Sequence, residues 1–166
     1  MRGEMTAATM ERTVRPRKDL FTPATLEEVK ERLARLRPDS ERLWGKMTAA
    51  QMLAHCAASM EMAVGLTFPP RRFIGRIVGP LAKKAVITEG QPFRRNSASD
   101  KILIIREERD FASERERLSG LLERFQAGGP AACTRHPHSF FGRLTSAEWA
   151  RLMYHHLDHH LQQFGV

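Results

Sequence analysis

The sequence lacks long hydrophobic runs. Its apolar stretches, such as Ile102–Ile105, end after four residues, whereas a membrane-spanning helix needs about 20 predominantly apolar residues. Residues 1–20 carry many charged side chains with no apolar stretch between them, which excludes a secretory signal there. We therefore expect a protein that is not integral to a membrane, with a flexible N-terminal arm over residues 1–19 and a single domain over residues 20–166.

Cysteine is also scarce. The two cysteines, Cys56 and Cys133, are too far apart in the sequence for a C-x-x-C motif, and two are too few to staple a domain of this size with disulfides. This usage is typical of a reducing compartment, and we expect a cytoplasmic protein. Cys56 falls on the apolar face of a predicted helix, where a packing role is expected.

Acidic residues are outnumbered by basic ones. The chain has 27 Lys and Arg against 19 Asp and Glu, a formal charge of +8. No motif for nucleic-acid recognition accompanies this excess of basic residues. The sequence has no zinc-finger spacing, no aromatic RNA-binding strand and only one tyrosine. We expect no specific nucleic-acid partner; nonspecific binding through basic doublets is the alternative.

Helical patterns dominate what is present. A Ser or Thr followed three residues later by Glu or Gln is the signature of a capping box at a helix start. It occurs at Thr25 with Glu28, Thr48 with Gln51, and Thr145 with Glu148. Together with apolar residues at helical spacing, these signals predict an all-α fold with helices over residues 25–37, 48–65, 111–126 and 146–164.

The connection over residues 66–100 is rich in Pro, Gly and basic residues. Phe73–Leu81 has the pattern of a short amphipathic helix, interrupted at Gly79 and Pro80. Such a segment can cap one end of the domain or lie on a membrane surface, and the sequence leaves both open. The run Lys101–Ile105 fits a short strand or the first turn of the helix that follows.

Four of the seven histidines lie within residues 154–163. Because successive helical residues are about 100° apart, His156 and His160 fall in the middle of the apolar arc of this helix, and His155 and His159 lie off its edge. Two imidazoles at i and i+4 present their nitrogens to one point from consecutive turns, as metal sites require. Gln163 shares this face. Packing of both rings in the core is the alternative.

A firmly held divalent ion needs about three protein ligands, so a third is expected from another helix. His55 is the candidate, because it is the only histidine of the second predicted helix. Three neutral imidazoles would leave positions open for water or substrate. His136 and His138 lie in a loop that could flank the site or simply be surface. Glu61 and Asp158 are candidate general bases, although helical carboxylates are usually solvated.

These residues resemble a known family. The pattern His156-x-x-x-His160-x-x-Gln163, with His55 following Trp44-Gly45-Lys46-Met47-Thr48, is similar to the DinB-like superfamily of metalloenzymes. His136-Pro137, Phe141-Gly142 and the C-terminal tail resemble a branch of it known as a domain of unknown function. The resemblance covers residues 20–166. It implies a four-helix bundle in up-down-down-up order, with the long connection between helices two and three, and a zinc or nickel site at His55, His156 and His160.

Characterised members of that superfamily act on substrates with low-molecular-weight thiols, which the metal converts to thiolates. We therefore expect a metal-dependent enzyme, a transferase or hydrolase, that activates a thiol or water with a small-molecule substrate. The alternative is a non-catalytic helical module for dimerisation or partner binding. A homodimer is compatible with either hypothesis.

Overall fold

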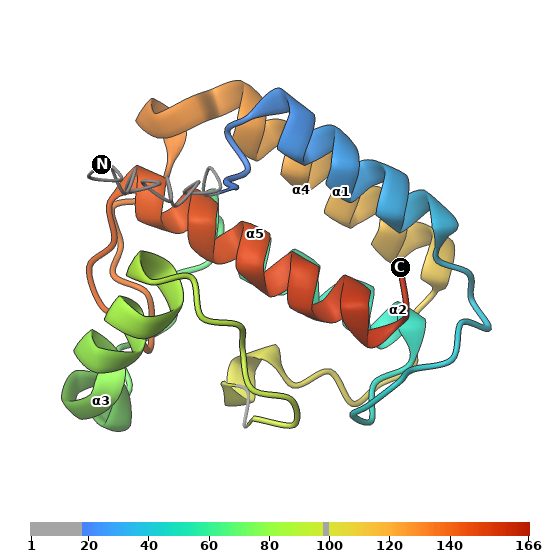
Figure 1. Cartoon of the computed structure of the whole chain (residues 1–166), viewed down its shortest axis with the longest axis horizontal. Helices are drawn as coiled ribbons and strands as arrows, with labels where there is room; N and C mark the ends of the chain where they lie inside the picture. Colours follow the sequence, from blue (N-terminus) through green and yellow to red (C-terminus); the bar gives the residue numbers. More distant parts are fainter. Residues whose placement is uncertain (1–17, 98–99) are drawn as a thin grey trace, which may run out of the picture.

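The structure is a computed structural model that describes residues 18–97 and 100–166. Every element within these residues is helical (Figure 1), as the sequence predicts. The α-helices are α1 (Pro23–Arg35), α2 (Ala49–Ala63), α3 (Phe73–Lys83), α4 (Phe111–Ala132) and α5 (Ser146–Gln163), and two short turns of other helix types are η1 (Lys84–Thr88) and η2 (Lys101–Leu103). The predicted arm, apart from Lys18 and Asp19, lies outside the described residues.

Four helices, α1, α2, α4 and α5, pack around one apolar core. Figure 1 shows α1 beside α4, with α5 in front of α2. The largest fully buried side chains come from α2, α4 and α5, from the residues that flank α1, and from η1: Leu20, Leu36, Met52, Leu53, Met60, Ile87, Leu118, Leu122, Trp149, Leu152, Met153 and Leu157. Among the described residues, no helix is long and apolar enough to span a membrane.

Two of the three predicted capping boxes are confirmed. The side chains of Thr48 and Thr145 each accept a hydrogen bond from the backbone three residues on, and Gln51 and Glu148 return the bond. The predicted box at Thr25 is wrong. There α1 begins at Pro23, and Thr25 lies buried in its first turn. Proline fixes φ near the helical value and lacks the N–H that a first turn leaves unpaired, so Pro23 starts the helix earlier.

The regular part of α4 ends where the sequence predicts. The helix starts at Phe111, where the Asp110 side chain accepts from the Ser113 N–H. The predicted end after Gln126, marked by Gly128 and Gly129, is confirmed by a break at Gly129, which has φ 58° and ψ −163° and separates a short second helical segment that continues to Ala132. Helical structure resumes after this glycine with Pro130, whose ring favours a first turn.

The connection between α2 and α4 contains α3, as predicted, but Gly79 and Pro80 do not interrupt it. The helix passes through both residues and continues into the π-helical turn η1. Neither prediction for residues 101–105 is right. Lys101–Leu103 form a separate 3-10 turn, which starts where the Asp100 side chain accepts from the Ile102 N–H.

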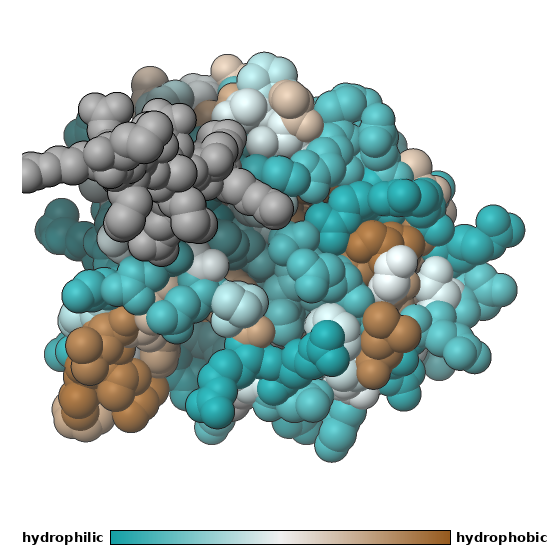
Figure 2. Space-filling view, viewed as in Figure 1, coloured by the Kyte–Doolittle hydropathy of each residue, from teal (hydrophilic) through white to brown (hydrophobic). Residues whose placement is uncertain are grey.

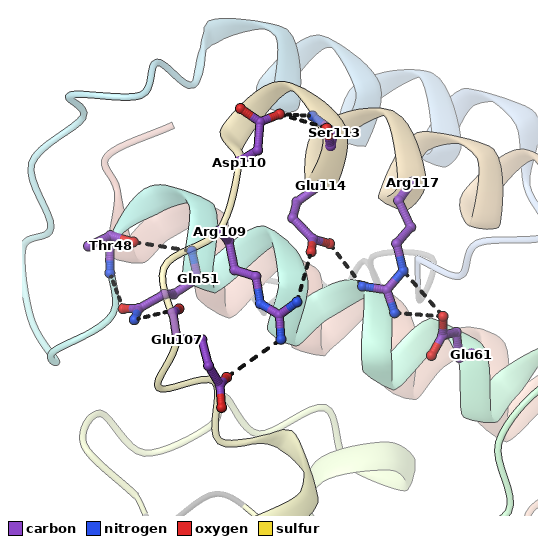
Figure 3. A network of polar contacts seen from close by, with 9 residues as sticks. All are labelled: Thr48, Gln51, Glu61, Glu107, Arg109, Asp110, Ser113, Glu114 and Arg117. Carbon is purple, nitrogen blue, oxygen red and sulfur yellow. Dashed lines mark hydrogen bonds and ion pairs between the residues drawn. The ribbon is translucent and has the colours of Figure 1, made fainter.

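Charged side chains join α2 to the start of α4 (Figure 3). Arg117 donates to Glu61 at 2.6 Å and to Glu114 at 2.8 Å. Glu114 also pairs with Arg109 at 3.8 Å. These contacts fix one end of α2 against α4, and α2 carries His55 toward α5.

Candidate metal centre

Three histidines from two helices meet inside the domain. His55 comes from the middle of α2, and His156 and His160 come from consecutive turns of α5. One ligating nitrogen of each lies within 4.8 Å of the other two. His55 and His160 are buried, and His156 is partly exposed. The three rings that the sequence groups as a ligand set are therefore neighbours, in an arrangement that could hold a metal ion.

The hydrogen bond to His55 fixes which of its ring nitrogens faces the cluster. Its Nδ1 lies 2.8 Å from the Leu103 carbonyl oxygen, and because a carbonyl only accepts, Nδ1–H must donate. In the neutral ring the lone pair is then on Nε2. Nε2 faces the cluster, where it accepts a hydrogen bond from His156 Nε2–H at 2.8 Å.

Gln163 fixes the orientation of His160 in the same way. The Gln163 amide nitrogen donates to the Trp44 carbonyl at 2.7 Å, which leaves the amide oxygen to accept from His160 Nδ1–H at 2.8 Å. The lone pair of His160 is then on Nε2. Outer partners of this kind orient metal-ligating histidines and increase their basicity.

Gly45 makes room for this arrangement. It adopts φ +81°, and a Cβ atom at this position would lie 2.4 Å from the Gln163 amide nitrogen. Only glycine meets both conditions without displacing the amide. This explains why the Trp44-Gly45 segment can carry the carbonyl that holds Gln163.

The third ring, His156, completes the cluster. Its Nε2 lies 2.8 Å from Nε2 of His55, within hydrogen-bond distance. Two nitrogens that bind one tetrahedral ion at about 2.0–2.1 Å would be separated by roughly 3.3 Å. A shift of one ring by about half an ångström would therefore convert this contact into a pair of ligands. The donor set, three imidazole nitrogens, is one that zinc, nickel, copper and iron accept.

Burial keeps these rings neutral. Burial, together with the neighbouring His55, lowers the pKa of His160 to about 3. Burial also lowers the pKa of His55 and, together with the charges of His160 and His55, that of His156 well below its usual value. A neutral imidazole is the form that binds a metal, so the cluster is in its ligating state at neutral pH.

Aromatic side chains surround the cluster. The Phe93 ring lies edge-on to His156 and His159, with ring centres 6.2 Å and 5.9 Å apart. The Trp44 ring lies 5.6 Å from that of His159, with the Arg95 guanidinium 4.2 Å above it. Phe93 and His156 are both partly exposed, so this side of the cluster lies nearest the protein surface.

The other histidines lie outside the ligand group. His155 and His159 are half-buried rather than fully outward, and neither joins the three. His136 bonds to the Pro69 carbonyl, and His138 Nδ1 accepts from the Phe140 N–H at 3.0 Å. His136 and His138 thus hold the loop before α5 in shape, and burial lowers the pKa of His138 to about 4.

The candidate general bases are engaged elsewhere. Glu61 pairs with Arg117 (Figure 3), and Asp158 accepts from Arg32 at 2.7 Å. The buried thiol of Cys56 lies in the core, as predicted, and burial raises its pKa. None of these three residues belongs to the histidine group.

Sequence reasoning missed two contributors to the site. The Leu103 carbonyl is a backbone group in a 3-10 turn, and no side-chain pattern marks it. Phe93 lies in an irregular segment without periodicity. The one usable signal was Gln163, which shares the face of His160 in the sequence pattern.

The fold and the cluster define an all-helical protein with a buried group of three histidines that could hold a metal ion. Residues 15–165 match the family described as "Protein of unknown function (DUF1569)", and the chain belongs to this family. No curated protein and no solved structure matches it.

Proposed function

We propose that this chain is a divalent-metal-binding protein in which His55, His156 and His160 ligate zinc or nickel. The observation that carries the proposal is the fixed orientation of two rings. The Leu103 carbonyl oxygen and the Gln163 amide oxygen each accept a hydrogen bond from an Nδ1–H, so the Nε2 lone pairs of His55 and His160 are directed at the cluster. A buried ring needs a hydrogen-bond partner in any role; what favours a metal is that both partners leave the unprotonated Nε2 atoms directed at the same cluster.

We also propose that the four long helices form the up-down-down-up bundle of the DinB-like superfamily. Support comes from the chain direction in Figure 1, where the sequence colours of α1 and α5 advance one way and those of α2 and α4 the other. The long connection between α2 and α4 is what this order requires, since two successive helices then run the same way.

For the activity, we propose a metal-dependent transferase or hydrolase acting on a small molecule. A bound divalent ion would supply a Lewis acid that lowers the pKa of a thiol or water. Three protein ligands leave room for that group, as in catalytic zinc sites. The partial exposure of His156 beside Phe93 supports access from solvent.

The thiol would belong to the substrate rather than to the chain. Cys56 and Cys133 are both buried, and burial raises the pKa of Cys133 to about 11. Thiols with raised pKa values are poor nucleophiles at neutral pH. The chain's own residues would orient the ligands and exclude bulk water, through Gln163, Leu103 and Phe93.

Metal analysis of untagged protein tests the proposal. We expect about one equivalent of zinc or nickel per chain and a higher melting temperature when the metal is added. His55→Ala, His156→Ala and His160→Ala should each abolish this stabilisation. His155→Ala, on the same helix but outside the group, is the matched control. No binding by the wild type, or equal loss in the control, would contradict the assignment.

A further inference from the structure

The outer face of α3 is apolar and uncovered. Phe73 is 78% exposed, Leu81 75%, Ile77 59%, Ile74 52% and Val78 38%. In Figure 2 the hydrophobic colour gathers over α3, at the lower left of the view. Large exposed apolar side chains that share one face of a helix usually mark an interaction surface. We call these five side chains the α3 apolar face.

The opposite face of α3 attaches the helix to the domain. Gly75 and Gly79 are buried against the loop before α5, where an added Cβ would lie 2.5 Å and 2.4 Å from the Phe140 carbonyl oxygen. Arg71 strengthens the attachment by donating to the His138 and Phe140 carbonyls at 3.0 Å and 3.1 Å. Close packing through the glycines thus directs the α3 apolar face away from the protein.

No other helix covers this face. Within residues 18–97 and 100–166, η1 is the only helical neighbour of α3. Figure 1 shows α3 at the edge of the domain, apart from the four packed helices. The α3 apolar face is therefore uncovered, although the opposite side of the helix attaches to the loop before α5.

The surroundings of the face are basic. Residues 66–88 contain Arg71, Arg72, Arg76, Lys83 and Lys84 and no Asp or Glu. Arg72, Lys83 and Lys84 have acidic partners outside this stretch, whereas Arg71 and Arg76 form no ion pair among the described residues. Exposed apolar side chains beside uncompensated positive charge are the features of a helix that lies in an anionic lipid surface.

We propose that α3 binds the protein to anionic membranes, with the α3 apolar face inserted among the lipid headgroups. The helix is far too short to span a bilayer, as an 11-residue helix is about 16 Å long. It is also small for a dimer interface, since one face of about 16 by 10 Å falls well short of the roughly 800 Å² per partner that stable interfaces bury.

Co-sedimentation with vesicles tests this proposal on the full chain. We expect binding to vesicles of phosphatidylcholine with 30% phosphatidylserine, weak binding to phosphatidylcholine alone, and a decrease in 0.5 M salt. The double variant Phe73→Ser/Leu81→Ser should lose about tenfold or more in the partition coefficient, because two apolar side chains leave the lipid. Arg76→Gln should lose about fivefold, the share of one basic residue near the surface.

Matched controls distinguish binding through the α3 apolar face from nonspecific binding to vesicles. Leu43→Ser removes an apolar side chain that is 69% exposed outside α3, and Arg37→Gln removes an exposed charge after α1; both should bind like the wild type. Equal loss in the controls would overturn the proposal. A wild type that does not bind anionic vesicles would also overturn the proposal. The same holds if the wild type fails to bind and sediments as a dimer, while the double variant sediments as a monomer.

Discussion

Replacing Gln163 with leucine tests how the site is built. Gln163 is 3% exposed and joins His160 to the Trp44 carbonyl through two hydrogen bonds. Gln163→Leu keeps the apolar bulk but removes both bonds. His160 then loses the acceptor that keeps its proton on Nδ1, so the ring can rotate or change tautomer. Loss of such an outer partner typically costs about 10–100-fold in metal affinity.

The same substitution should lower the free energy of unfolding. It leaves the Nδ1–H of His160 and the Trp44 carbonyl without their partner, and each unsatisfied buried group costs about 1–3 kcal/mol. This loss should be present without added metal. The loss of metal affinity should come in addition to this loss of stability, since metal affinity compares the metal-free and the metal-bound folded protein.

The assay is a zinc titration against a competing fluorescent chelator, at a temperature where circular dichroism shows the variant folded. Gln162→Leu is the control, because the neighbouring residue is exposed and bonds only to Asp158. We expect Gln162→Leu to bind zinc like the wild type. A Gln163→Leu protein that binds zinc with unchanged affinity would refute the role of the amide in orienting His160.

Three further predictions concern stability and reactivity. The pKa of His138 is about 4 in the folded chain against 6.5 for the unperturbed side chain, so protons favour the unfolded state. The contribution of His138 to the free energy of unfolding, about 3 kcal/mol, is fully present above pH 6.5 and is lost as the pH falls toward 4. His138→Asn should flatten this part of the pH dependence of stability, as measured by urea titrations. Gly79→Ala should destabilise the chain by about 1–3 kcal/mol because the added Cβ would contact Phe140. Gly120→Ala in α4, where nothing lies within 4 Å of an added Cβ, should stabilise the chain by about 0.5–1 kcal/mol. Equal shifts in the melting temperatures of the two variants would contradict the packing argument. Cys56 and Cys133 should react with a thiol reagent only after urea is added, because both are buried, and a fast-reacting thiol in the native protein would show that one of them is accessible.

The elements that the sequence predicts well are those with local chemistry. Thr48 and Thr145 start their helices through contacts that span three residues, and the helical arc of α5 separates His156 and His160 from their neighbours. Pro23 and Thr25 show the limit of the same reasoning, since both carry start signals and only the backbone decides between them.

Contacts between residues far apart in the sequence could not be predicted from the sequence. The pairing of His55 with Leu103 depends on a 3-10 turn 48 residues away, and the exposure of the α3 apolar face depends on Gly75 and Gly79 docking against Phe140. An amphipathic helix has the same hydrophobic pattern in the sequence whether its apolar face is buried or exposed. The sequence therefore left the two roles of this helix open.

In the proposed site, three imidazoles bind one metal ion. X-ray absorption at the zinc edge of the loaded protein tests this arrangement, because histidine rings produce characteristic multiple scattering beyond the first shell. We expect three imidazole nitrogens at about 2.0–2.1 Å in the wild type and no zinc retained by His156→Ala. A first shell that contains sulfur, or one with fewer than three imidazoles in the wild type, would contradict the claim.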